Sequence, residues 1–331
     1  MTTNLPDDSH FRQVLHAIQK DRLVPFFGAG VNLANRPLVP DGGSAPKLAA
    51  WTPGQRFLPS GAELSQHLAG SYGYPEQDTW DLLRVSQYIA VESGPAGLYE
   101  DLRQVFNADF PPTPVHDFFA QLPALLRERG GGKSHLLIVT TNYDDLMEQS
   151  LTAAGEPFDV VTYVADGRDS GKFRHCPPGA RPVLVERPNE YRDVSLDQRH
   201  VVLKIHGAVD RASQNVEDDS YVITEDHYID YLTRTDLTNL IPVTLAAVLQ
   251  NRHFLFLGYS LRDWNLRAIL HRIWGAQKLK RNSWSVQLKP QAIENKLWQR
   301  RNVEILDVSA ADYIAELRRR VESLPVAGGA S

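Results

Sequence analysis

Four short hydrophobic runs, each ending in a polar or glycine-rich turn, constrain the fold of this chain more than any other feature. The turns that follow them are Gly28-Ala29-Gly30, Thr141-Asn142-Tyr143-Asp144, His206-Gly207 and Gly258-Tyr259-Ser260. Short apolar runs of this kind are typical of strands in a parallel sheet that helices cover on both faces. Such a sheet places its ligand beyond the carboxyl ends of its strands, so the four turns are expected to converge on a nucleotide site.

Helical patterns alternate with these runs, which favours a Rossmann-like, doubly wound α/β fold with a mainly parallel sheet. Strands are expected at residues 23–27, 136–140, 201–205, 253–257, 284–288 and 303–308. Helices are expected at residues 62–69, 78–91, 116–129, 146–154, 225–232, 237–249 and 264–274. We interpret residues 1–331 as a single domain, in which residues 35–60 and 167–192 lack periodicity and are predicted to be loop or lid insertions.

Composition and charge exclude several classes of protein. The net charge of −5 argues against non-specific binding of nucleic acid, and we interpret two basic clusters, at residues 278–281 and 318–320, as solvated helix ends. Cys176 is the single cysteine, so one chain cannot form a disulfide or a cysteine-based zinc site. Neither a signal peptide nor an apolar stretch long enough for a membrane helix is apparent, so a cytoplasmic location is expected.

Three common motifs are only partly matched. Leu33 stands where a dinucleotide-binding dehydrogenase has its third glycine. Gly132-Lys133-Ser134 precedes a strand, whereas the end of a Walker phosphate loop follows one. Arg262 replaces the closing glycine of a serine-hydrolase elbow. The sequence therefore disfavours an ordinary dehydrogenase, a Walker-type nucleotidase and a serine hydrolase.

Two residues at the strand ends each have a structural and a functional interpretation. Asn142 either caps the following helix or directs its amide toward a sugar hydroxyl, a carboxamide or water. His206 is either a satisfied core histidine or a base toward a ribose hydroxyl.

Taken in order, the four turns resemble the motifs of the sirtuin superfamily. Gly28-Ala29-Gly30-Val31 is similar to its first glycine-rich turn, and Thr141-Asn142-Tyr143-Asp144 to its threonine-glutamine-asparagine-isoleucine-aspartate segment. His206-Gly207 is similar to its histidine-glycine pair, and Gly258-Tyr259-Ser260-Leu261 to its late glycine-serine turn. The resemblance covers roughly residues 23–270.

The departures from the sirtuin pattern narrow the resemblance. Protein deacylases of the superfamily carry a four-cysteine zinc module, which a chain with one cysteine cannot form, so no zinc is expected. Asn32 replaces the usual serine, and residues 34–37 replace a proline-aspartate-phenylalanine-arginine segment. The residues of the remaining motifs resemble those of bacterial sirtuin-like effectors of anti-phage defence. This resemblance implies a hydrolase that cleaves NAD+.

The resemblance also implies roles for particular residues. Asn142 would hold the nicotinamide ribose and the attacking water, His206 would activate or orient a hydroxyl or water, and Asp144 would orient Asn142 or the ribose. The residues expected to bind the rest of NAD+ are Gly28, Ala29, Gly30, Asn32, Thr141, Gly258, Tyr259 and Ser260. Asp144 and Asp263 are equally suited to capping helices.

Two other functions remain open from the sequence. The chain is either a hydrolase or a module that senses NAD without destroying it, and a zinc-free, NAD-dependent deacylase is a third alternative. A homo-oligomer is expected, and the resemblance implies a HerA-type hexameric ATPase or another defence protein as an activating partner.

Overall fold

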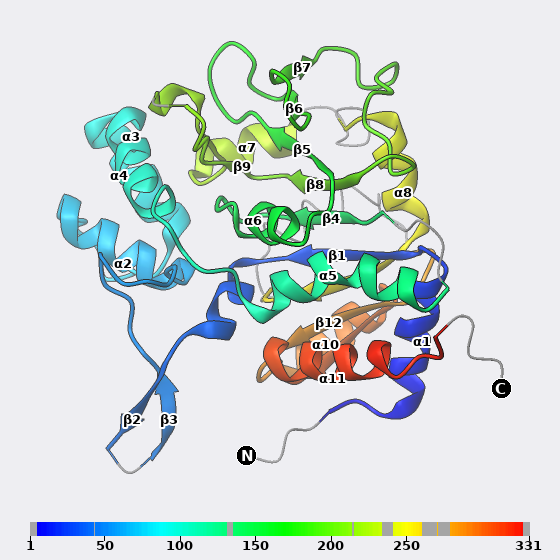
Figure 1. Cartoon of the computed structure of the whole chain (residues 1–331). Helices are drawn as coiled ribbons and strands as arrows, with labels where there is room; N and C mark the ends of the chain where they lie inside the picture. The colour runs from blue at the N-terminus through cyan, green and yellow to red at the C-terminus, as the bar shows by residue number, and fades with distance from the viewer. Residues whose placement is uncertain are drawn as a thin grey trace.

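The computed structural model describes residues 5–42, 44–130, 135–213, 215–233, 241–259, 270 and 279–326. Its centre is a nine-stranded sheet in the order β13-β12-β11-β1-β4-β8-β5-β6-β7 (Figure 1). The seven parallel strands are β1 (Leu23–Phe27), β4 (Leu137–Thr140), β5 (Phe158–Tyr163), β8 (His200–Lys204), β11 (His253–Leu257), β12 (Ser283–Gln287) and β13 (Val303–Asp307). The predicted Rossmann-like α/β fold with a mainly parallel sheet is confirmed.

Helices cover both faces of this sheet. One face packs against α1 (Asp8–Gln19), α5 (Pro114–Glu128), α6 (Leu146–Ala153) and α11 (Ala310–Glu322), whose apolar side chains share one buried cluster. Side chains of α7 (Glu225–Thr233), α8 (Val243–Asn251) and α10 (Ala292–Gln299) join the cluster on the other face. The last helix is capped at its start, because the Ser309 hydroxyl accepts a hydrogen bond of 3.0 Å from the Asp312 amide.

The segment 167–192 is the first place where the structure differs from the prediction. It contains β6 (Phe173–Cys176) and β7 (Val183–Val185), which extend the main sheet as antiparallel edge strands beyond β5. Phe173 and Val185 are buried in the central core. The prediction of a loop or lid is therefore wrong for these strands, because their partner β5 lies outside the segment and went unrecognised.

The segment 35–60 also contains regular structure. Strands β2 (Leu38–Asp41) and β3 (Ser44–Leu48) pair as an antiparallel hairpin, which projects away from the sheet (Figure 1). Trp51 and Leu58 anchor the rest of the segment in a third hydrophobic cluster. The whole segment was predicted to be a loop or lid, whereas residues 38–41 and 44–48 form strands.

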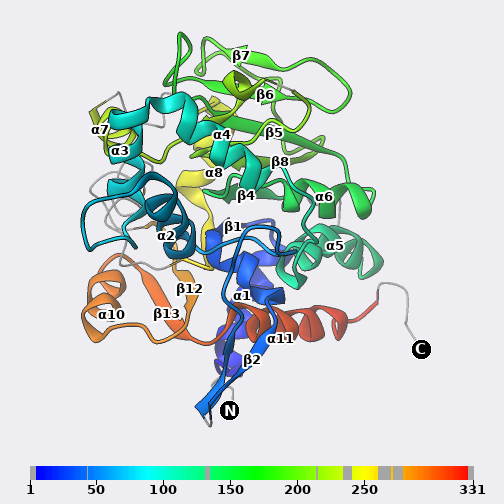
Figure 2. The same cartoon turned by 90° about the vertical axis from the view of Figure 1, so that its left-hand side faces the viewer.

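That third cluster belongs to three helices inserted between β1 and α5. They are α2 (Gly61–Tyr72), α3 (Leu82–Ser93) and α4 (Pro95–Phe106), of which α4 was not predicted and α3 begins four residues later than expected. The group lies beside the edge at which the central parallel strands end (Figures 1 and 2). These helices therefore form one wall next to the converging turns.

The remaining helices and strands are short. They are the 3-10 helices η1 (Ala29–Asn35) and η2 (Val216–Asp218) and the paired strands β9 (Gly207–Ala208) and β10 (Ser220–Tyr221). The predicted helix at 264–274 lies almost wholly outside the described residues, and the one at 237–249 is seen only from residue 243. Among the described residues, no helix is long and apolar enough to cross a membrane.

Candidate functional site at the carboxyl ends of four strands

The four predicted turns follow four neighbouring strands. Strands β11, β1, β4 and β8 are adjacent in the sheet and parallel, so their carboxyl ends lie side by side. After β1 the chain continues to β4 on one side, and after β8 it returns to β11 on the other side of β1. A topological switch point therefore lies between β1 and β11, where doubly wound folds form their binding crevice.

The two glycine-rich turns at this switch point are packed directly against each other. The amide of Gly28 donates to the Leu257 carbonyl at 3.0 Å, and that of Gly30 donates to the Gly258 carbonyl at 2.9 Å. A Cβ on Gly30 would lie 2.6 Å from the Gly258 oxygen, and one on Gly258 would lie 2.2 Å from the Val31 nitrogen. Only glycine permits so close an approach of two backbones.

The neighbouring turn is tied to this pair through Tyr259. Its hydroxyl donates to the hydroxyl of Thr141, and its ring packs edge-on against Phe26 at 5.4 Å between centroids. Ser260, the last residue of the predicted late turn, lies outside the described residues. The predicted residues Thr141 and Tyr259 are therefore in contact.

Three polar side chains of the predicted site form a buried group at the ends of β1 and β4. Asn32 donates from Nδ2 to Asp144 Oδ2 at 2.8 Å, while Asp144 Oδ1 accepts from the Leu146 amide at 3.2 Å. Asn142 donates from Nδ2 to the Gly28 carbonyl at 3.4 Å. Asp144 thus accepts from the first amide of α6, whose N-cap position is Asp145, and also orients Asn32.

His206 lies next to this group in the sheet register. Thr140 and Lys204 are paired residues of β4 and β8, and Asn142 and His206 each follow two positions later. The His206 ring is 7% exposed and lies edge-on to Tyr228, with 5.5 Å between the ring centroids. Burial lowers the pKa of His206 to about 3, so its imidazole is neutral at pH 7.

Three polar atoms of these residues have no hydrogen-bond partner among the described residues. They are Asn32 Oδ1, Asn142 Oδ1 and His206 Nε2, and all three are buried. Leaving a buried polar atom unpaired costs about 1–3 kcal/mol. Three such polar atoms at the carboxyl edge of one sheet are typical of a site whose ligand or ordered water supplies the missing hydrogen-bond partners.

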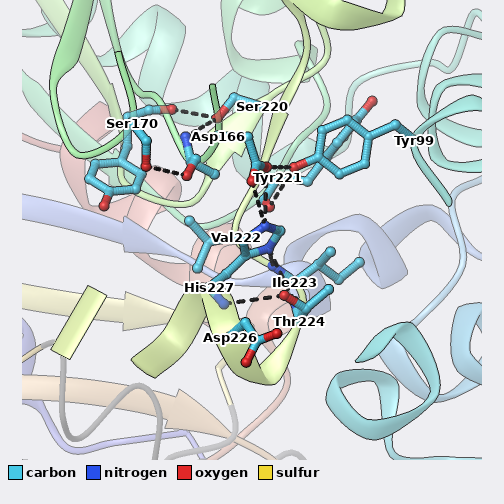
Figure 3. A network of polar contacts seen from close by, with 12 residues as sticks. Tyr99, Asp166, Ser170, Ser220, Tyr221, Val222, Ile223, Thr224, Asp226 and His227 are labelled. Atoms are coloured by element: carbon cyan, nitrogen blue, oxygen red, sulfur yellow. Dashed lines mark hydrogen bonds and ion pairs between the residues drawn. The ribbon is translucent and has the colours of Figure 1, made fainter. Parts of the chain in front are cut away.

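Polar contacts hold the segment at residues 220–227 in place (Figure 3). This segment pairs with the backbone at and after His206. The His206 carbonyl accepts from the Val222 amide at 2.8 Å. Beyond it, His227 Nδ1 accepts from the Ile223 and Thr224 amides at 3.2 and 3.3 Å, and His227 Nε2 contacts Asp166 at 3.1 Å. Tyr99 of α4 also donates to Asp166. The inserted helices are thus linked to the segment that positions His206.

A buried ion pair behind the site was missed by the sequence analysis. Lys204, which is 2% exposed, donates to the backbone carbonyl of Asp144 and lies 2.8 Å from Glu148 Oε1. Burial raises the pKa of Glu148, and the Lys204 charge opposes that rise. A lysine inside an otherwise apolar strand was the available signal, because a buried lysine requires a partner.

A small hollow opens beside the polar group. Its volume is about 150 Å³, and Asn32, Arg56, Phe57 and Phe110 are among the residues that line it. Within the part of the chain that the structure describes, no group of three or more His, Cys, Asp or Glu residues has the arrangement to hold a metal ion. The polar groups of the site are backbone turns, the amides of Asn32 and Asn142, the carboxylate of Asp144 and the neutral imidazole of His206.

Comparisons with known proteins agree with this geometry. A defence-associated sirtuin 2 of Bacillus subtilis is 23% identical over 250 residues, covering 72% of this chain and 20% of its own length. An NAD(+) hydrolase ThsA of Enterococcus faecium is 28% identical over 276 residues (82% and 44%). The same enzyme of Cytobacillus dafuensis is 29% identical over 198 residues (60% and 31%). The chain spans less than half the length of each of these relatives.

The family assignment rests on a match to a family model. Residues 136–306, just over half of the chain, match the SIR2-like domain. This stretch begins at β4 and ends in β13, and it contains the turns of Asn142, His206 and Gly258. The chain therefore belongs to the family of SIR2-like, or sirtuin-like, domains.

Proposed function

We propose that this chain is an NAD+ hydrolase that releases nicotinamide and acts as an effector of anti-phage defence. The observation that carries this proposal is the set of three buried, unpaired polar atoms on Asn32, Asn142 and His206, at the switch point of a sirtuin-like sheet. The names of the relatives, NAD(+) hydrolase and defence-associated sirtuin, support both the reaction and its setting.

In the proposed reaction, water adds to the anomeric carbon of the nicotinamide ribose while the glycosidic bond to nicotinamide breaks. The bonding electron pair passes to the ring nitrogen, which neutralises the cationic ring, and the water loses a proton. A neutral leaving group needs no strong acid, so binding and orientation supply most of the catalysis.

The unpaired atoms of Asn142 and His206 are suited to hold the reacting groups. Asn142 Oδ1 is placed to accept from the attacking water or a ribose hydroxyl, and His206 Nε2 from a second hydroxyl. With a pKa of about 3, His206 is a weak base, so we assign it mainly to holding and orienting a hydroxyl. Asn32 and Asp144 would form the end of the pocket that receives the nicotinamide carboxamide.

The remaining half of NAD+ would lie over the glycine turns. Because the amides of Gly28 and Gly30 already donate to the protein backbone, the proposed diphosphate contact there rests on Ala29, which is exposed. Gly258, Tyr259 and Ser260 are proposed to contact the adenosine half.

The test is nicotinamide release from NAD+ with no acylated peptide added. Asn142→Ala and His206→Ala are each expected to lower the rate by about a hundredfold or more, whereas Asn295→Ala, a change on the exposed surface of α10, is expected to keep it. NAD+ that binds to the wild type but is never cleaved would favour the sensing module, and cleavage only with an acyl-peptide would favour a deacylase.

We also propose that activity depends on self-assembly or on a partner such as a HerA-type hexameric ATPase. The inserted helices α2–α4, linked to the His206 segment through Tyr99 and Asp166, offer a route by which contact outside the sheet changes the site. Light scattering and turnover measured over a concentration series test this point. Full activity in a stable monomer without a partner contradicts it.

A further inference from the structure

A second hollow lies at the opposite end of the sheet from the proposed NAD+ site. Its volume is about 520 Å³, and it is lined by residues of α1 and by the amino-terminal ends of β11 and β12. These strands are parallel and five residues long, so the hollow lies about 15 Å from the turns at their other ends. Figure 1 shows α1 at this end of the sheet, away from α2–α4.

The hollow is lined by positive charge. Its cationic side chains are Arg12, Lys280 and Arg281, two histidines (His16 and His253) line it as well, and no aspartate or glutamate is among its described lining residues. This concentration stands out because the whole chain carries a net charge of −5. The cluster at residues 278–281 was interpreted from the sequence as a solvated helix end, but two of its members, Lys280 and Arg281, line a concavity together with α1.

Neutral groups, rather than carboxylates, hold these cations. Arg281 Nε donates to the Asn251 carbonyl at 2.7 Å, and Lys280 Nζ lies 3.4 Å from Asn251 Oδ1. Neither residue, nor Arg12, has an ion-pair partner among the described residues. Within the described residues, these three cations thus lack a carboxylate at ion-pair distance, although Asp8 attracts Arg12 at longer range.

The histidine in the wall reports this local field. His253 stacks on Trp284 with 5.4 Å between the ring centroids, and its Nδ1 donates to the Asn282 carbonyl at 2.7 Å, which fixes the ring. Burial lowers the pKa of His253, and the nearby Arg281, Arg22 and His16 lower it further. No carboxylate contributes to that shift, which is consistent with an environment prepared for an anion.

We propose that this hollow binds a small phosphate-bearing ligand of the nucleotide class, at a site separate from that of NAD+ cleavage. Its volume falls within the usual range of small-molecule pockets, about 300–1,000 Å³. Arginine and lysine side chains from two segments can contact one diphosphate from both sides, and the flat His253–Trp284 stack forms an adjoining wall.

The test is calorimetric titration of ADP into the full chain and into Arg12→Glu/Lys280→Glu. The wild type is expected to show one site more than the double variant, or an affinity at least about tenfold higher, since each tenfold corresponds to 1.4 kcal/mol. The matched control is Lys289→Glu/Lys296→Glu, which changes the net charge equally at exposed positions outside the hollow. This control is expected to behave as the wild type.

Differential acetylation of lysines locates the site independently of the catalytic pocket. ADP is expected to protect Lys280 but not Lys296 from acetylation, as measured by mass spectrometry. Equal loss of binding in the two double variants, or equal protection of the two lysines, overturns the proposal in favour of diffuse electrostatics. No ADP binding that depends on the hollow also overturns it, and so does tighter binding of a single-stranded oligonucleotide than of ADP.

Discussion

Gly258 is the residue on which the contact between the two glycine-rich turns depends. Its φ of +67° is one that L-amino acids with a side chain rarely adopt, and its Cα faces the backbone of Gly30 and Val31. Glycine is therefore favoured at this position both by the backbone conformation and by the lack of space for a side chain. Gly28 is constrained differently, since its added Cβ would meet the Tyr259 ring at 2.6 Å.

Replacing Gly258 by alanine is expected to lower the free energy of unfolding by at least about 1–2 kcal/mol, because the left-handed conformation and the clash add. NAD+ cleavage is expected to fall more than stability alone explains, because the turn that carries Tyr259 must move. Urea denaturation and nicotinamide release measure the two effects. Gly61→Ala is the control, since a Cβ there meets nothing within 4 Å, and a similar loss in both variants would refute the explanation.

At the scale of elements, β8 and α6 are joined by the buried pair of Lys204 and Glu148. The pair holds the strand that delivers His206 against the helix that follows Asp144. Both charges are removed from water, so the pair stabilises the fold only while both partners are present. The loss of one partner leaves the other as an uncompensated buried charge.

Lys204→Met is therefore expected to destabilise the protein by about 3–5 kcal/mol. Lys204→Met/Glu148→Leu is expected to recover much of that loss, because no buried carboxylate then remains unpaired. Chemical denaturation of both variants decides the point. A double variant as unstable as the single one would mean that the bond from Lys204 to the Asp144 carbonyl, rather than the ion pair, matters most.

The elements that could be predicted from sequence are those whose signals are local. The apolar runs of β1 and β11 were predicted with the observed bounds, and their glycine turns marked the switch point. Strands β5, β6 and β7 were missed because their identity depends on pairing with distant segments, not on a continuous apolar run. Likewise, the residues of the site were predicted from turn motifs, whereas the contact of Asn32 with Asp144 joins positions 112 apart in sequence.

At the scale of the whole molecule, buried neutral histidines couple stability to pH. Burial lowers the pKa of His10 and His116 to about 4 and that of His206 to about 3. The three lie in different parts of the structure: His10 contacts Tyr313, His116 lies at the start of α5, and His206 lies at the candidate site. Their effects on the free energy of unfolding should therefore be nearly additive.

The direction in which the free energy of unfolding changes with pH follows from proton binding. The unfolded histidines have pKa values near 6.5 and bind protons at pH 5–6, whereas the folded ones do not. Stability is thus fully present above pH 6.5 and is lost as the pH falls toward the folded values of about 3–4. Each histidine is expected to lower the free energy of unfolding by about 2 kcal/mol between pH 7 and pH 5.

Urea denaturation at half-unit steps from pH 7.5 to pH 5 measures this loss. His10→Gln, which cannot titrate, is expected to reduce the slope of stability against pH by about 1 kcal/mol per unit below pH 6, whatever its effect on stability at pH 7. His16→Gln is the matched control, because it makes the same substitution at an exposed position. A wild-type stability that stays constant down to pH 5 would show that the buried histidines take up protons without unfolding.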